Sequence, residues 1–276
     1  TTPSTNIVEL VEVNIDTGEK IRSKTLLLGH ANSLTFNTKT NTILSATLYK
    51  YINGVRTYVS EIVEIDYNTL TIKNVIDFKT TENISGVAYD KEKDKVYIML
   101  DPFIIGICDP LTYEIEKRIY LKVPDNIKNF TRQSFEVWEE KIFLCGFRQN
   151  YLSSYDFEGN NIQNYNISDY IDNMFLTGEV EDISSLGNGD FILFSVQNIS
   201  NKFLINSISK FGLIKQVLTG VPFTVTNPNA PIKIYVDVNS NHHNPNGTNE
   251  KPFKQLNEAI MSLTHTRFAN VEIYLA

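Results

Sequence analysis

The stretch that decides the fold is GVAYDKEKDKVYIMLDPFIIGICDPLTYEIEKRIYL, residues 86–121. It holds four short apolar segments separated by polar turns, at residues 86–90, 95–99, 105–108 and 115–121. Short apolar runs bounded by turn residues are typical of β-strands. Asp109 follows one strand directly, as Asp66 and Asp156 do elsewhere, and aspartate is favoured in such turns. The stretch therefore predicts two consecutive β-hairpins.

The same pair of hairpins recurs along the chain. Equivalent strands contain Ile43, Val96, Ile142 and Phe191, at steps of 53, 46 and 49 residues. A repeat of four short strands at this period is typical of a β-propeller blade. No helical pattern interrupts residues 7–218. The repeat therefore predicts an all-β fold of the propeller type.

The number of hairpins predicts how many blades there are. The chain begins with an outer hairpin at residues 7–28, so that five outer hairpins accompany only four inner ones. We therefore predict a five-bladed β-propeller over residues 1–222 with an incomplete first blade. A four-bladed ring with an extra closing hairpin is the alternative. The chain begins with Thr1 rather than an initiator methionine, which leads us to expect a fragment whose missing inner hairpin precedes it.

The C-terminal part has a different pattern. Prolines and asparagines mark residues 223–231 as a linker. Beyond it we expect a strand at residues 232–237, an amphipathic helix at residues 253–263 and a strand at residues 271–275, because the apolar positions of the middle segment recur at helical spacing.

This C-terminal pattern resembles the opening of pectate-lyase-like right-handed β-helices. The matching residues are Tyr235-Val236-Asp237, Asn246-Gly247-Thr248, Lys251-Pro252-Phe253-Lys254, Leu256 and Ala259-Ile260. The first coil of a solenoid exposes apolar surface and strand edges, which an amphipathic helix covers. The resemblance implies that residues 232–276 form the N-terminal cap and first strand of a β-helix.

A propeller followed by a β-helix resembles bacteriophage tail fibres and receptor-binding proteins, in particular the five-bladed platforms of phages of staphylococci and other Gram-positive hosts. The resemblance implies a virion protein of the tail or baseplate, made in the bacterial cytoplasm, which binds a cell-wall glycopolymer such as glycosylated teichoic acid. It also implies a homotrimer in the full-length protein and contacts with other tail or baseplate proteins. A polysaccharide depolymerase with catalytic residues on absent β-helix coils, and a purely structural baseplate adaptor, are the alternatives.

Composition and charge exclude several other partners. The chain has 276 residues, of which 42% are hydrophobic, and 25 Lys and Arg against 32 Asp and Glu give a net charge of −7. A duplex-DNA-binding face or an anionic-membrane patch needs clustered Lys and Arg. No apolar run approaches the roughly 18 residues of a bilayer-spanning helix. We therefore expect neither nucleic acid nor membrane as a partner.

Metal and cofactor sites are not indicated. Cys108 and Cys145 lie in apolar runs without a second ligand, which predicts two buried free thiols. His242-His243 shares a loop with Asp237, but the spacing that pre-organises a metal site is missing. Phosphate-binding glycine motifs are missing as well. We expect no metal and no cofactor.

Acidic residues on the innermost strands are the only catalytic candidates. They are Glu136, Glu181 and Asp182, which could converge near the axis of the propeller. Thr35 and Ala88 occupy the equivalent positions in other blades, so no ring of acids exists. Glycosidase chemistry needs a correctly spaced pair of carboxyl groups. We favour channel-lining carboxylates, expect no catalytic residue and predict that the chain is not an enzyme.

Carbohydrate binding is the function for which candidate residues remain. A sugar ring has an apolar face and many hydroxyl groups, so its binding sites combine aromatic faces with amides, hydroxyls or charged groups. Inter-strand loops offer such combinations at Tyr49, Tyr51, Arg148, Asn150 and Tyr151. We predict these five residues as the ligand-binding candidates, with exposed turn aromatics as the alternative.

Overall fold

The protein is described by a computed structural model in which the described part of the chain is all-β. It contains twenty strands, β1–β20. The described residues are 6–14, 19–78, 80, 82–100, 103–124, 131–147, 151–166, 178–186, 190–200, 203–212, 217–222, 232–241, 245, 248–256 and 271–275.

Sixteen of these strands form four antiparallel sheets of four strands, each sheet running through consecutive strands of the chain. The first sheet comprises β3 (Ala31–Asn37), β4 (Thr42–Ile52), β5 (Val55–Asp66) and β6 (Thr71–Asp77). The second comprises β7 (Ile84–Asp90), β8 (Lys95–Leu100), β9 (Ile104–Cys108) and β10 (Ile115–Tyr120). The third comprises β11 (Thr131–Trp138), β12 (Lys141–Phe147), β13 (Tyr151–Tyr155) and β14 (Asn161–Asn166). The fourth comprises β15 (Gly178–Ser185), β16 (Asp190–Ser200), β17 (Phe203–Gly212) and β18 (Val217–Pro222).

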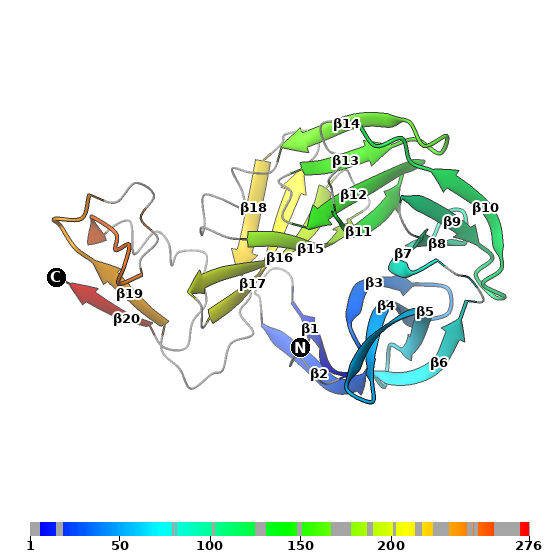
Figure 1. The fold of residues 1–276 in the computed structure, drawn as a ribbon, viewed down its shortest axis with the longest axis horizontal. Helices are drawn as coiled ribbons and strands as arrows, with labels where there is room; N and C mark the ends of the chain where they lie inside the picture. The colour runs from blue at the N-terminus through cyan, green and yellow to red at the C-terminus, as the bar shows by residue number, and fades with distance from the viewer. Residues whose placement is uncertain are drawn as a thin grey trace.

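The four sheets are arranged around a common axis, with β3, β7, β11 and β15 innermost (Figure 1). Hydrogen bonds join these innermost strands across the axis. The Asn32 side-chain amide donates to the carbonyls of Ser85 (2.6 Å) and Gln133 (2.7 Å). The hydroxyls of Ser33 and Ser134 lie 3.1 Å apart. Because these groups are buried, the bonds satisfy backbone and side-chain atoms that water cannot reach.

The remaining N-terminal hairpin packs beside the first sheet. It consists of β1 (Ile7–Val13) and β2 (Lys20–Leu27), which form a two-stranded sheet among the described residues. Leu26 of this hairpin is buried against Val63 and Ile65 of β5. The described part of the chain thus has one two-stranded hairpin ahead of four complete four-stranded sheets, which confirms the sequence-based count of hairpins.

The apolar core lies between neighbouring sheets. Ile62 of the first sheet packs in one cluster with Ile84 and Ile98 of the second. Tyr97 of the second sheet packs with Phe135 of the third, and both side chains are almost fully buried. The alternation of apolar residues that predicts the strands also supplies these faces, since successive side chains of a strand point to opposite sides. Cys108 and Cys145 are buried free thiols, as predicted.

Two strands at the C-terminus pair in parallel. β19 (Ile232–Val236) and β20 (Val271–Leu275) align residue for residue, and the rings of Tyr235 and Tyr274 stack at 4.9 Å. A bridge from Val236 to Phe253 adds a third segment. The predicted linker, 223–231, and most of the predicted helix, 257–263, lie outside the described residues. Within the described chain no helix is long and apolar enough to cross a membrane.

Candidate functional site: an axial pocket and a tyrosine arm

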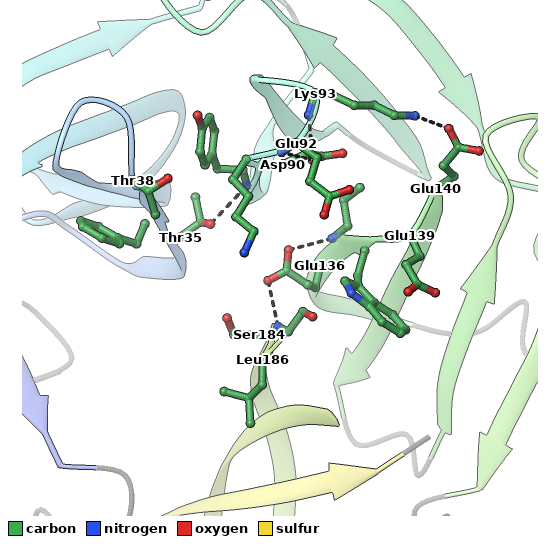
Figure 2. A pocket seen from close by; sticks show the side chains of 16 residues that line it. Thr35, Thr38, Asp90, Glu92, Lys93, Glu136, Glu139, Glu140, Ser184 and Leu186 are labelled. Carbon is green, nitrogen blue, oxygen red and sulfur yellow. Dashed lines mark hydrogen bonds and ion pairs between the residues drawn. The ribbon is translucent and has the colours of Figure 1, made fainter. Parts of the chain in front are cut away.

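An open pocket of about 640 Å³ lies at one end of the four innermost strands (Figure 2). Ligand pockets typically measure about 300–1,000 Å³, so the hollow could hold a small molecule or a sugar unit. We call it the axial pocket. Its lining residues come from the ends of β3, β7, β11 and β15 and from residues that directly follow these strands. They are Thr35, Phe36, Thr38, Tyr89, Asp90, Lys91, Glu92, Lys93, Glu136, Val137, Trp138, Glu139, Glu140, Ser184, Ser185 and Leu186.

Glu136 is the buried acid of the axial pocket. Its side chain is only 8% exposed, yet it lines the hollow. Its carboxylate accepts the backbone N–H of Val137 at 2.8 Å and that of Ser185 at 3.2 Å (Figure 2). Desolvation by burial is the main cause that raises the pKa of Glu136 to about 7; the two N–H hydrogen bonds oppose this rise, and the nearby carboxyl of Asp182 contributes to it. The carboxyl of Glu136 therefore gains and loses its proton near neutral pH and not in the acidic range of an exposed glutamate.

Asp182 joins three of the innermost strands. From β15, its carboxylate accepts a hydrogen bond from the Ser134 hydroxyl on β11 and another, at 3.3 Å, from the Leu34 N–H on β3. Burial raises the pKa of Asp182 to about 6. The neighbouring Glu181 accepts a hydrogen bond from the Gln133 side-chain amide. The acids that the sequence places on the innermost strands thus meet along the axis, where they hold β11, β15 and β3 together.

Aromatic side chains supply the apolar part of the axial pocket. Trp138, the single tryptophan of the chain, is half-buried, with its ring edge-on to Phe191 at 5.6 Å. Phe36 is 40% exposed and contacts Tyr67 at 5.0 Å between ring centroids. An aromatic ring in a hollow provides a flat apolar surface for a ligand. Hydroxyl groups of Thr35, Thr38, Ser184 and Ser185 lie among the lining residues.

Charge at the axial pocket is mostly negative. Lys93 forms an ion pair with Glu140 at 2.8 Å, which offsets one carboxylate of the rim. The lining acids are Asp90, Glu92, Glu136, Glu139 and Glu140, against the two bases Lys91 and Lys93. This balance disfavours anionic ligands relative to neutral or cationic ones. Among the described residues no group of acids, histidines and cysteines has the arrangement of a metal site.

A second feature is the hairpin of β4 and β5, whose tip is the turn Asn53-Gly54. Both turn residues have positive φ, 52° and 78°, which is the geometry of a tight hairpin turn. The register pairs Tyr49 with Tyr58 and Tyr51 with Arg56. Because alternate residues of a strand share a face, these four side chains lie together. We call this set, Tyr49, Tyr51, Arg56 and Tyr58, the tyrosine arm.

The tyrosine rings and the Arg56 guanidinium pack closely on the tyrosine arm. The Tyr49 and Tyr51 rings meet edge to face at 5.9 Å, and those of Tyr49 and Tyr58 at 6.1 Å. The guanidinium of Arg56 lies 3.8 Å from the centre of the Tyr49 ring. His30 contacts the same ring at 4.5 Å. Tyr49 is therefore surrounded by its neighbours, whereas Tyr58 is 52% exposed.

The structure thus brings two of the five predicted ligand-binding residues, Tyr49 and Tyr51, into one cluster. Arg148, Asn150 and the side chain of Tyr151 lie outside the described residues. Sequence reasoning did not select Arg56, Tyr58 or Trp138. The Asn53-Gly54 turn could have pointed to Arg56 and Tyr58, because a two-residue hairpin turn determines which residues of the two strands face each other.

Four antiparallel sheets around an axis, with a pocket at one end, define an all-β protein of the β-propeller type. No family model and no curated protein matches the chain. Three similar solved structures have low sequence identity to this chain. A protein of unknown function from Bacteroides caccae is 12% identical, with 81% of this chain and 71% of that chain covered and a TM-score of 0.46. The RRP9 WD40 repeats are 7% identical, with 78% of this chain and 75% of that chain covered and a TM-score of 0.45, and the Cps50 (Swd1) β-propeller domain of Myceliophteria thermophila is 11% identical, with 76% and 59% covered and a TM-score of 0.39. What this protein binds has to be inferred from its own residues.

Proposed function

We propose that the protein is a non-enzymatic attachment module that binds a cell-surface glycan, with one saccharide unit held in the axial pocket. The observation that supports this function most directly is the composition of that pocket. It combines the half-buried Trp138 and the exposed Phe36 with hydroxyl and carboxyl groups in a hollow of about 640 Å³. This is the combination that sugar recognition requires.

The chemistry of the axial pocket favours a neutral sugar over a phosphate. A ring stacked on Trp138 would bring its hydroxyls towards Thr35, Ser184 and the carboxyl of Glu136. Near neutral pH that carboxyl accepts hydrogen bonds when ionised and also donates one when protonated. The excess of carboxylates around the pocket repels anions. In a glycosylated teichoic acid, the sugar substituent would therefore be the recognised part.

The finer features of the proposal concern the whole protein. We propose a phage tail fibre or baseplate protein, homotrimeric and part of the virion, in which a five-bladed propeller precedes a β-helix. The two-stranded β1–β2 hairpin ahead of four complete sheets is consistent with an incomplete first blade. The parallel pairing of β19 with β20 supports a β-helix over residues 232–276, because successive coils of such a helix pair in parallel.

Trp138 offers a direct test, because the fluorescence of the single tryptophan reports on the axial pocket alone. The chain is screened against neutral oligosaccharides and against wall polymer with and without its sugar substituents. We expect a saturable change in Trp138 fluorescence with the polymer that carries its sugar substituents, and no change with the polymer that lacks them.

Two variants locate the binding. Phe36→Ser is expected to weaken binding by about tenfold, a loss of about 1.4 kcal/mol, which is within the range of a stacked aromatic contact. Tyr120→Ser is the matched control, because Tyr120 is 63% exposed on β10 and is not part of the pocket lining. Equal affinities of both variants, or binding by a chain that lacks residues 1–222, would contradict a site in the axial pocket. Cleavage of the polymer by the full-length protein would instead indicate a depolymerase.

A further inference from the structure

Arg56 differs from the other arginines whose side chains are described. Arg22 pairs with Glu12, and Arg118 pairs with Glu82. Among the described residues no carboxylate forms an ion pair with Arg56, although its side chain is exposed at the tip of the tyrosine arm. The contacts that the structure shows for the Arg56 guanidinium are with aromatic rings.

The tyrosine arm holds the guanidinium of Arg56 in place. It lies 3.8 Å from the ring centre of Tyr49 and 5.2 Å from that of Tyr58. Such contacts attract the cation to the ring faces while leaving the N–H groups at its edge free to donate. Less side-chain entropy is lost on binding when the guanidinium is already positioned.

The base of the arm is tied to the rest of the protein. The backbone N–H of His30 donates to the Tyr49 carbonyl at 2.8 Å, and the Leu48 N–H donates to the His30 carbonyl at 3.1 Å. Burial, together with the charge of Arg56, lowers the pKa of His30. His30 is therefore uncharged at neutral pH, and Arg56 is the cation that the arm presents.

We propose that the tyrosine arm is a binding site for an oxyanion, of the phosphate ester or carboxylate type, which accepts two parallel N–H bonds from Arg56. Guanidinium groups bind both oxyanions in this bidentate way. The phenol hydroxyls of Tyr49, Tyr51 and Tyr58 are further donors on the same face. This site goes beyond the proposed function: it is separate from the axial pocket and opposite to it in charge.

The test uses the whole chain and two small probes, methyl phosphate and acetate, each titrated at constant ionic strength against chloride. The side-chain Nε–H resonance of Arg56 is followed by NMR. We expect a saturable shift with at least one probe, and the stronger of the two identifies the kind of oxyanion. If both probes shift the resonance no more than chloride does at the same ionic strength, the proposal is overturned.

The binding affinities of variants distinguish a specific site at Arg56 from general attraction of anions to positive charge. The ring resonances of Tyr58 report binding when Arg56 is replaced. Arg56→Gln is expected to weaken binding about tenfold or more. Arg56→Lys should weaken it by less, because lysine keeps the positive charge but lacks the two parallel N–H donors of the guanidinium. Lys117→Gln, which removes a charge from an exposed position on β10, is the matched control and should bind normally. Equal affinity of Arg56→Gln and the unsubstituted chain would refute the site. Saccharide binding reported by Trp138 should be the same in Arg56→Gln, so the two proposals fail independently.

Discussion

Glu136 allows a quantitative prediction about stability and pH. Burial raises its pKa from an ordinary value of 4.5 to about 7. Between these two values the folded state holds a proton that the unfolded state has released, so stability falls as the pH rises through this window. Each pKa unit corresponds to about 1.4 kcal/mol, so the group lowers the free energy of unfolding by up to about 3 kcal/mol between pH 4.5 and pH 7.

Glu136→Gln replaces the carboxyl with a neutral group of the same shape. At pH 4 the native carboxyl is protonated in both states, so a stability difference there reflects only the backbone N–H, of Val137 or of Ser185, that faces the amide nitrogen of the variant and loses its acceptor. From pH 4 to pH 8 the stability of the variant relative to the unsubstituted protein should rise by up to about 3 kcal/mol, because an amide cannot ionise in the buried site.

The measurement is urea unfolding followed by circular dichroism at pH 4.0 and pH 8.0, on either side of the isoelectric point of about 5.2. Glu92→Gln, at an exposed position of the same pocket, is the control and should change stability little at either pH. A stability difference between Glu136→Gln and the unsubstituted protein that is the same at both pH values would refute the reasoning.

Three further predictions concern the rest of the fold. Gly159→Ala should destabilise the protein by about 2 kcal/mol or more by urea unfolding, since Gly159 has φ of +80° and an added Cβ would lie 2.0 Å from the Tyr120 carbonyl oxygen. Asn32→Ala should lower the free energy of unfolding by about 2–3 kcal/mol, because two carbonyls across the axis lose their buried donor; a change below 0.5 kcal/mol, roughly that of a surface substitution, would speak against this network. Burial raises the pKa of Cys108 to about 12 and that of Cys145 above its usual range. Neither thiol should therefore react with a disulfide reagent at pH 8 until urea is added. Rapid labelling of the native protein would contradict their burial.

Local sequence determined most of the strand pairing. Asp66, Asp109 and Asp156 accept hydrogen bonds from backbone N–H groups two to four residues ahead, so each is a turn residue, as predicted. Turns of this kind depend on a few neighbouring residues, which a sequence displays directly. The arm at Asn53-Gly54 could have been predicted in the same way, including the pairing of Tyr51 with Arg56.

The contacts along the axis could not be predicted in this way. Leu34 donates to Asp182 over a separation of 148 residues, and Ser185 donates to Glu136 over 49. The sequence places the acids on innermost strands, but the arrangement of the blades decides which carboxyl is buried, which partners it receives and how far its pKa moves.

The sequence by itself therefore determined the repeat, the hairpins and the antiparallel strand order, because period-two patterns and turn chemistry act over a few residues. The tertiary structure alone decided that the ends of the four innermost strands meet around an open pocket with Trp138 and Glu136 in its lining. It also decided that Arg56 lies over the ring of Tyr49, with no ion pair to a carboxylate among the described residues. Burial and desolvation are properties of the assembled fold, and they give these side chains their chemistry.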